Sequence, residues 1–230
     1  MPYFYGIDTY YILLVLPAII LSLIAQGLVK STFSKYSKMQ CNLTGAEAAK
    51  RVLQANGIYD VQVTSVSGNL TDHYDPEANI IRLSDSVYNA RSVAAVGVAC
   101  HEAGHAVQYA NSYLPIKLRS TIYPLANLGS SLSIPLIVLG IFLSIPILID
   151  IGIIVFAAAV IFHLVTLPVE FNASRRAVRA IKDYNILLDD SEISGARKVL
   201  TAAALTYIAS FLVSLMQFLR LVAIANRRRR

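Results

Sequence analysis

Charge is scarce in this chain of 230 residues. Charged side chains make up only 15% of the sequence, whereas 56% are hydrophobic, and the mean hydropathy is +0.57. In soluble domains, charged residues make up about a quarter of the sequence. The composition therefore excludes an ordinary soluble domain, and we predict an integral membrane protein with the lipid bilayer as a partner.

Cysteine is also scarce, since Cys41 and Cys100 are the only two and lie far apart in the sequence. No disulfide framework is expected from them, and a reducing compartment is the default. The net charge of +6 and the pI near 9.3 could suggest nucleic acid. However, the positive charges lie beside apolar runs and in Arg227 to Arg230, which favours anionic lipid headgroups as the partner and not nucleic acid.

Apolar runs of membrane-spanning length dominate the chain. Residues 10–29 form the first run, and Lys30 and two further lysines follow it, so the positive-inside tendency places the N-terminus outside and the following region in the cytoplasm. Residues 128–149 and 151–167 are separated only by Asp150 and predict a transmembrane hairpin with Asp150 at its tip. A hairpin returns the chain to the side it left, so the segment after it is also expected in the cytoplasm.

Two of the four histidines occur in the pattern H-E-x-x-H, which is His101-Glu102-Ala103-Gly104-His105 here. Residues four apart share one face of a helix, so His101 and His105 can bind one metal ion with Glu102 beside it. The flanking residues are small and apolar, which predicts a buried helix that begins near Ser92. Burying two imidazoles and a carboxylate without a ligand is costly, so a metal site is favoured over an exposed helix that carries a histidine pair.

A catalytic zinc site needs a third protein ligand and leaves the fourth position to water. Glu170 is the carboxylate that we expect to complete the site. It follows the second run of the hairpin and is expected at the start of a helix, where a negative charge is favourable. The other glutamates considered lie in segments of solvated character. An ordinary glutamate at a helix N-terminus is the alternative.

The segment before the motif predicts a short helix and a small sheet. Thr44 and Glu47 form a capping box at the start of the helix, and Gly57 ends it. Residues 61–66 and 79–83 read as strands of a two- or three-stranded sheet, and one of them is a candidate to hold a substrate chain by β-augmentation. His73, between them, is either a turn histidine bonded to its neighbours or a residue that binds the substrate or the transition state.

Residues 201–225 form a further apolar segment, in which polar residues recur at spacings of three and four. A crossing from the cytoplasm would place the terminal arginines outside, against the positive-inside tendency. We therefore predict a helix that lies in the membrane surface or packs on the cytoplasmic region, with the arginine tail at cytoplasmic headgroups. A fourth full crossing is the alternative.

These motifs resemble the neutral zinc metallopeptidases of bacterial membranes. The similarity covers nearly the whole chain and rests on the first span and on residues 70–76, 82–84, 101–106 and 170–176. More distantly, the chain is similar to HtpX-type and CAAX-prenyl-type membrane peptidases, whose second motif is E-[FY]-x-A-D. The resemblance implies that Glu170 is the third zinc ligand. Ser174 stands where those relatives have aspartate, which leaves open the role of that aspartate here.

The leading functional hypothesis is a membrane-bound zinc metallopeptidase that cleaves peptide or protein substrates, membrane proteins among them, at the cytoplasmic face of the cell membrane. His101, His105 and Glu170 would bind Zn²⁺, and Glu102 would be the general base. Candidates for binding the substrate or the transition state are His73, Arg176 and Tyr207. A non-catalytic zinc-binding scaffold or sensor and a transporter with a metal site are the alternatives; Cys100 projects about 100° from His101 around the helix and is a poor fourth ligand for a structural zinc.

The predicted fold is a mainly α-helical integral membrane protein with a small β-sheet and a minimal zincin-like (gluzincin) domain. Five regions are expected: an N-terminal transmembrane helix (1–30), a cytoplasmic zincin-like region with the motif helix (31–127), the transmembrane hairpin (128–167), a cytoplasmic helical region with the third ligand (168–200), and an apolar or amphipathic C-terminal helix with a basic tail (201–230).

Overall fold

The computed structural model describes residues 8–228, and the side chains of 8–226. The chain forms two compact units. The mixed unit comprises residues 26–116 and 169–205, and the helical unit comprises the chain up to residue 25, residues 117–168 and the chain from residue 206. The expected contact of the arginine tail with headgroups concerns side chains outside the described residues.

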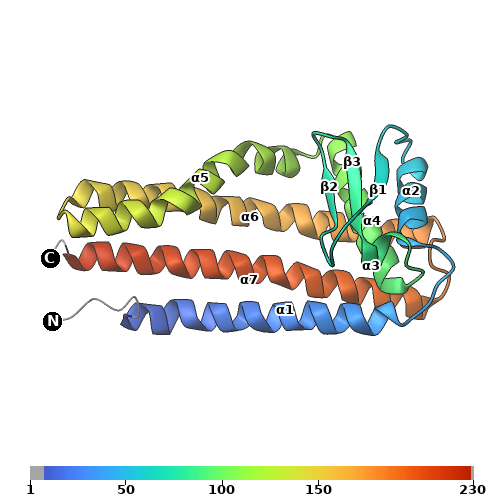
Figure 1. The fold of residues 1–230 in the computed structure, drawn as a ribbon, viewed down its shortest axis with the longest axis horizontal. Coiled ribbons are helices and arrows are strands. Elements are labelled where there is room, and N and C mark those ends of the chain that lie inside the picture. Colours follow the sequence, from blue (N-terminus) through green and yellow to red (C-terminus); the bar gives the residue numbers. More distant parts are fainter. Residues whose placement is uncertain (1–7, 229–230) are drawn as a thin grey trace. The chain divides into compact units, whose positions relative to one another are not determined.

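The secondary structure confirms a mainly α-helical chain with one small sheet (Figure 1). In chain order the elements are η1 (Tyr11–Val15), α1 (Leu16–Ser37), α2 (Gly45–Ala55), β1 (Gln62–Val66), β2 (His73–Asp75), β3 (Ile80–Ser84), α3 (Asp85–Tyr88), α4 (Val93–Ala110), α5 (Leu114–Phe142), α6 (Pro146–Asp183) and α7 (Asp190–Arg228).

The sheet of the mixed unit has the strand order β1-β3-β2. β1 runs parallel to β3, and β2 runs antiparallel to it with His73 opposite Arg82. The two predicted strands are confirmed. For His73, the alternative of a turn residue bonded to its neighbours is wrong about the turn, although the ring does bond to Thr71. Its segment forms the edge strand β2 because it pairs with β3, and Asp75 adds an ion pair to Arg82 at 2.6 Å. Both outer strands keep one edge unpaired within this sheet.

Local sequence signals set the ends of α2 as predicted. The Thr44 hydroxyl accepts a hydrogen bond from the Glu47 backbone N–H, while the Glu47 carboxylate accepts one from the Thr44 N–H. Gly57 follows the helix with φ +70°, a conformation that costs glycine least. One face of α2 is buried and packs against α4.

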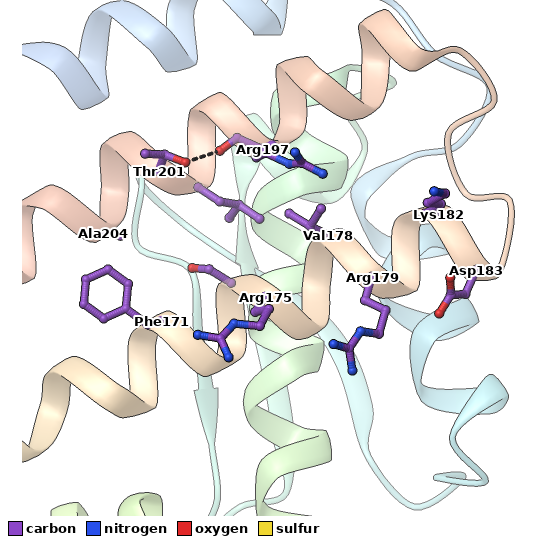
Figure 2. A pocket seen from close by; sticks show the side chains of 11 residues that line it. Phe171, Arg175, Val178, Arg179, Lys182, Asp183, Arg197, Thr201 and Ala204 are labelled. Carbon is purple, nitrogen blue, oxygen red and sulfur yellow. Dashed lines mark hydrogen bonds between the residues drawn. The ribbon is translucent and has the colours of Figure 1, made fainter.

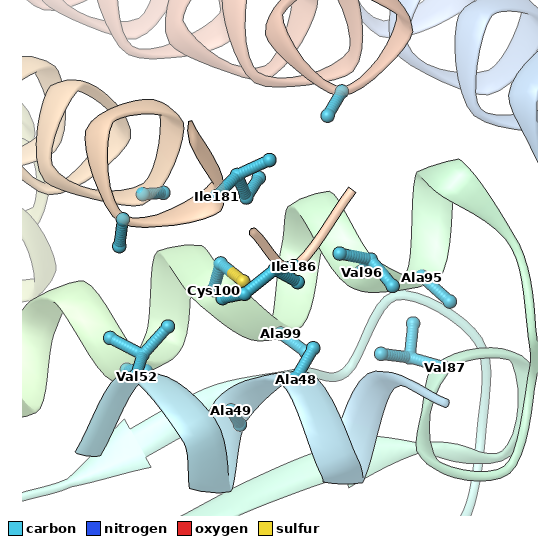
Figure 3. Close-up of a cluster of buried hydrophobic side chains, with 14 of the residues drawn as sticks. Ala48, Ala49, Val52, Val87, Ala95, Val96, Ala99, Cys100, Ile181 and Ile186 are labelled. Carbon is cyan, nitrogen blue, oxygen red and sulfur yellow. The ribbon is translucent and has the colours of Figure 1, made fainter. Parts of the chain in front are cut away.

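The motif helix α4 is the centre of the mixed unit. It begins next to Ser92, as predicted, and Ser92 caps it by accepting a hydrogen bond from the Ala95 N–H. Small residues let neighbouring helices approach closely, and most of α4 is buried. Figure 3 shows α4 side chains, including Val96 and Cys100, packed with Val52 of α2 and with Ile181 of α6. The site residues on α4 therefore belong to a packed core that holds them in place.

Within the described residues, four helices are long and apolar enough to cross a membrane: Tyr11–Ser37 (η1 with α1), α5, α6 and the segment Asp190–Asn226 of α7. The break between α5 and α6 lies at Leu143 to Ile145, so the expectation that Asp150 forms the hairpin tip is wrong. Pro146 explains the shift, because proline suits the first position of a helix and disfavours helix in the residue before it. Asp150 consequently lies in the first turns of α6.

Helix α6 runs without a break from Pro146 to Asp183, with Pro168 inside it. The expectation that Glu170 lies at the start of a helix is therefore wrong. Proline lacks one backbone N–H, but a long helix can continue past this lost hydrogen bond. The negative charge of Glu170 is thus not stabilised by a helix N-terminus. Its stabilisation depends on the side chains that surround the carboxylate.

Helix α7 is also one uninterrupted helix, and its C-terminal part belongs to the helical unit. Arg220 forms an ion pair with Asp8 at 2.8 Å, and its guanidinium lies 5.1 Å from the centre of the Tyr11 ring. Inside this unit, the end of α7 therefore lies beside the start of η1. The surface orientation of residues 201–225 stays a prediction, and this ion pair favours the alternative of a fourth crossing antiparallel to α1.

Candidate metal centre

Three side chains converge in the core of the mixed unit. His101 and His105 come from successive turns of α4, and Glu170 comes from α6. The His101 Nε2 lies 3.2 Å and the His105 Nε2 lies 3.5 Å from Glu170 Oε2. One ligand atom from each residue lies within 4.8 Å of the others. The structure therefore brings together the three ligands expected from the sequence.

The three side chains are buried, and burying polar or charged groups is unfavourable unless they have a binding partner. His101 and His105 are each 8% exposed, and Glu170 is 2% exposed. Burial by itself lowers the pKa of His105, but the hydrogen bond and the charge of Glu170 outweigh it, with further contributions from Glu102 and Gln108. The pKa of His105 is consequently raised above its ordinary value. The centre is thus electrostatically negative and suited to a cation.

The orientation of His105 is set by Gln108, which is fully buried on the same helix. Gln108 Nε2 donates to the Val169 carbonyl at 2.9 Å, so the other end of the amide must be its oxygen. That oxygen lies 3.0 Å from His105 Nδ1 and can only accept a hydrogen bond. His105 therefore donates from Nδ1, and Nε2, which faces Glu170, is the nitrogen left to bind a metal.

Ser174 gives His101 a comparable partner. Its hydroxyl lies 3.2 Å from His101 Nδ1, on the ring edge opposite to the Nε2 that faces Glu170. Ser174 stands where the distant relatives have aspartate, so in this chain a neutral hydroxyl occupies the position of a carboxylate. It can orient the ring, but it adds no negative charge behind the ligand.

Asn172 connects the site to Arg176. Its Oδ1 accepts a hydrogen bond from Gln108 Nε2 at 2.9 Å and another from Arg176 Nε at 2.8 Å. Arg176, one of the residues expected to bind the substrate or the transition state, thus belongs to the network that positions His105. Every link in this chain of hydrogen bonds has a donor and an acceptor, which makes the network rigid.

Glu102, the residue predicted to be the general base, lies beside the cluster. Its side chain is buried beside the site and contributes negative charge to His105, yet it is not one of the three clustered ligands. Among residues 8–226, no hydrogen bond to its carboxylate is found. A carboxylate in this state is free to accept a proton from a water molecule.

The remaining candidates lie elsewhere. His73 is exposed on β2, and its Nδ1 donates to the Thr71 carbonyl at 2.8 Å. Tyr207 belongs to the helical unit and not to the mixed unit. Cys100 is fully buried in the core, where burial raises the pKa of its thiol, and it is absent from the ligand cluster. Both cysteines are free thiols.

Comparisons with known proteins agree with this geometry. Residues 11–226 match the family described as "Putative neutral zinc metallopeptidase". The chain belongs to this family. A curated relative, "Putative membrane protease YugP" of Bacillus subtilis (strain 168), is 50% identical over 217 residues, which cover 93% of this chain and 96% of the relative. No solved structure matches the chain.

Membership of the metallopeptidase family implies zinc, and the residues present fit that ion. Two imidazole nitrogens and one carboxylate oxygen are ligands that Zn²⁺ prefers, and a set of three protein ligands is typical of catalytic rather than structural sites. Gln108 and Ser174 hold both rings with Nε2 toward the cluster. The donor set and its supporting hydrogen bonds are therefore both in place.

Reasoning from the sequence did not find Gln108 and Asn172. Gln108 lies three residues after His105, so it shares the helical face of the metal ligand, and it is the polar residue in an otherwise small and apolar segment. Asn172 lies four residues before Arg176 on α6. These spacings were available as signals, but the contact between α4 and α6 that gives them meaning is tertiary.

Gly104 explains how α4 and α6 come close enough to share the site. A Cβ built on Gly104 would lie 2.9 Å from the Ala173 carbonyl oxygen on α6. Gly97 faces Ala196 on α7, but there a Cβ would lie at an ordinary 3.5 Å. The two glycines are thus a matched pair on one helix, one at a contact that admits no side chain and one with room.

We expect Gly104→Ala to weaken zinc binding roughly tenfold or more, because α6 must move and carries Glu170 and Ser174 with it. Gly97→Ala should leave zinc affinity unchanged and stabilise the helix by up to about 1 kcal/mol. Competition with a chromophoric chelator measures the affinity, and thermal unfolding measures the stability. Equal affinities in the two variants would show that this close contact does not position the ligands.

Proposed function

We propose that this chain is a membrane-bound zinc endopeptidase that hydrolyses peptide bonds at the cytoplasmic membrane face. The observation that carries the proposal is the convergence of His101, His105 and Glu170 next to a buried carboxylate, Glu102, that is not needed as a ligand. The three clustered groups would hold the metal. Glu102 would do the proton chemistry.

When bound, zinc lowers the pKa of a water molecule towards ~7 and polarises the carbonyl of the scissile peptide. Glu102 would accept a proton from the attacking water as the water oxygen bonds to the peptide carbon. Glu102 then donates the proton to the departing amide nitrogen as the C–N bond breaks. The carboxylate ends the cycle as it began, and one water molecule is consumed for each peptide bond.

β2 is the strand that we infer to align the substrate. It is an edge strand of three residues, and its Tyr74 ring packs against Tyr109 of α4 with ring centres 5.5 Å apart. A strand edge next to the motif helix can hold an extended peptide by backbone hydrogen bonds. Such recognition reads the backbone, so it favours unfolded or extended segments of membrane or membrane-proximal proteins.

The proposed cytoplasmic orientation of the metal centre predicts which introduced cysteines a membrane-impermeant reagent can label. We expect a cysteine at Glu77, in the exposed turn before β3, to react with a membrane-impermeant maleimide in inside-out vesicles and not in intact cells. A cysteine at Leu143, in the break between α5 and α6, should show the opposite pattern. Both are placed in a Cys41→Ser background. The reverse pattern at the two positions would place the metal centre outside the cytoplasm.

The activity itself is tested with the purified full-length chain in detergent. Zinc-loaded protein should cleave an unfolded protein substrate into fragments that mass spectrometry identifies, and removal of the metal with a chelator should stop cleavage. Readdition of zinc should restore it. A chain that binds zinc stoichiometrically but releases no fragments from unfolded substrates or from membrane proteins would contradict the proposal.

A further inference from the structure

A cavity with a volume of about 420 Å³ lies in the mixed unit, between α6 and α7 (Figure 2). Its walls contain both charged and apolar residues. Arg175, Arg179 and Lys182 of α6 and Arg197 of α7 are basic, and Asp183 is the one acidic residue among the lining. The cavity therefore carries a clear excess of positive charge.

The four cations are available to a ligand. Each is exposed, and among the described residues none of them has an ion pair or a side-chain hydrogen bond of its charged group. On α6 they recur at spacings of four and three residues, which places them on one face of the helix. Arg197 lines the same cavity from the opposite helix.

Apolar residues line the cavity at one end, and Val178 adds an apolar side chain in its middle. Figure 2 shows Phe171 and Ala204 together at one side and Lys182 with Asp183 at the other. Phe171 follows closely on Pro168, where α6 leaves its apolar segment, and Ala204 precedes the apolar C-terminal part of α7. On each helix the lining thus begins with an apolar residue next to the apolar segment, and the basic residues lie farther away, with Val178 and Leu200 close to them.

This gradient matches an amphipathic anion whose apolar part lies toward the bilayer. Basic pockets between helices at the cytoplasmic side are suited to anionic lipid headgroups. Inorganic phosphate would use the basic end only and would leave the apolar end without a role. The charge and its direction together favour a phospholipid over a small anion.

An acidic substrate is less well placed. Ser174 lines the cavity and contacts His101 at Nδ1, whereas Nε2 of that ring faces Glu170. The cavity is thus behind the metal ligand and not on the side where a scissile peptide meets the ligand cluster. A ligand here touches the support of the metal centre instead of the reacting atoms.

We propose that the cavity between α6 and α7 binds one anionic phospholipid, with its phosphate at the basic residues of the lining and its acyl chain along Phe171. Binding would hold the two helices together around Ser174. The site acts by binding alone, so it does not depend on whether the chain hydrolyses peptides.

The test is a titration of the purified full-length chain, in an uncharged detergent, with phosphatidylglycerol and with phosphatidylcholine, followed by native mass spectrometry. We expect one phosphatidylglycerol to bind at least tenfold more tightly than phosphatidylcholine. Arg179→Gln combined with Arg197→Gln should lower the affinity for phosphatidylglycerol roughly tenfold or more, because the double variant removes two positive charges that attract the anionic headgroup. Thermal unfolding verifies that the variant is folded.

The matched control removes the same charge outside the cavity. Lys198 is the exposed neighbour of Arg197, and Arg51 is exposed on α2; neither lines the cavity. Lys198→Gln with Arg51→Gln should change the affinity less than twofold. An equal loss in both double variants would show diffuse surface attraction and overturn the site.

Two further arms separate the sources of the anion. Phe171→Ala should weaken phosphatidylglycerol binding at least threefold while leaving the weak binding of inorganic phosphate unchanged. If millimolar inorganic phosphate displaces the lipid completely, the site recognises phosphate alone and the lipid assignment is wrong. Displacement of the lipid by an acidic peptide would instead assign the cavity to the substrate and would also overturn the proposal.

Discussion

Zinc-loaded Glu102→Gln is expected to hold as much metal as the wild type and to cleave an unfolded substrate at least a hundredfold more slowly. The amide has the size of the carboxylate, so the buried environment is kept, but it cannot accept the proton of the attacking water. General-base catalysis contributes about 10²–10⁴ in rate, which sets the expected loss. Zinc content should not change because Glu102 is outside the ligand cluster.

The measurement pairs the cleavage rate with the zinc stoichiometry of the same sample. Glu77→Gln is the matched control, since Glu77 is exposed in the turn before β3, and it should cleave at the wild-type rate. Cleavage by Glu102→Gln at the wild-type rate would remove Glu102 from the mechanism. Loss of zinc together with activity would show that Glu102 is needed to build the site.

Glu170→Ala is expected to lower zinc affinity by about two orders of magnitude or more. Supporting residues of a zinc site alone are worth about 10- to 100-fold, and a ligand should exceed them. The substitution leaves two buried imidazoles with neither the carboxylate nor its charge, so the negative character that attracts the cation is also lost. Activity should disappear at zinc concentrations that saturate the wild type.

Competition with a chelator of known affinity gives the zinc dissociation constants, and Glu77→Ala serves as the control. Glu170→Gln adds a second comparison, because it keeps the shape but not the charge. Both Glu170 variants should be weak binders. Wild-type affinity in Glu170→Ala would mean that the third ligand is another residue, and it would require a different centre from the one described.

Much of the local structure follows from short-range signals. The capping box of Thr44 and Glu47 predicted the start of α2, because cap hydrogen bonds involve residues three apart, and the motif helix begins next to Ser92 as predicted. The H-E-x-x-H spacing placed His101 and His105 on one helical face for the same reason. The family and the mainly helical fold with a small sheet were likewise predicted and are confirmed.

The predictions that proved wrong concern segments whose local sequence is compatible with two different structures. Asp150 interrupts an apolar run and was expected at a tip, but Pro146 decides where the helix begins. His73 lies in a segment rich in turn residues, yet pairing with β3 makes it a strand. Pro168 could have ended a helix, but α6 continues past it, so Glu170 lies within the helix rather than at its start.

The sequence by itself determined the membrane character, which depends on composition, and the motif helix with His101 and His105, which depends on residues close together in the chain. It also predicted Glu170 as the third ligand, but partly from a helix start that the structure does not have. Only the tertiary structure decided which partners hold those ligands. Asn172 bonds to Gln108 and Ser174 bonds to His101 across the contact of α4 with α6, whose closeness depends on Gly104. The two residues of each such pair lie more than sixty positions apart in the sequence. Their contact follows from how two helices pack, which no local pattern encodes.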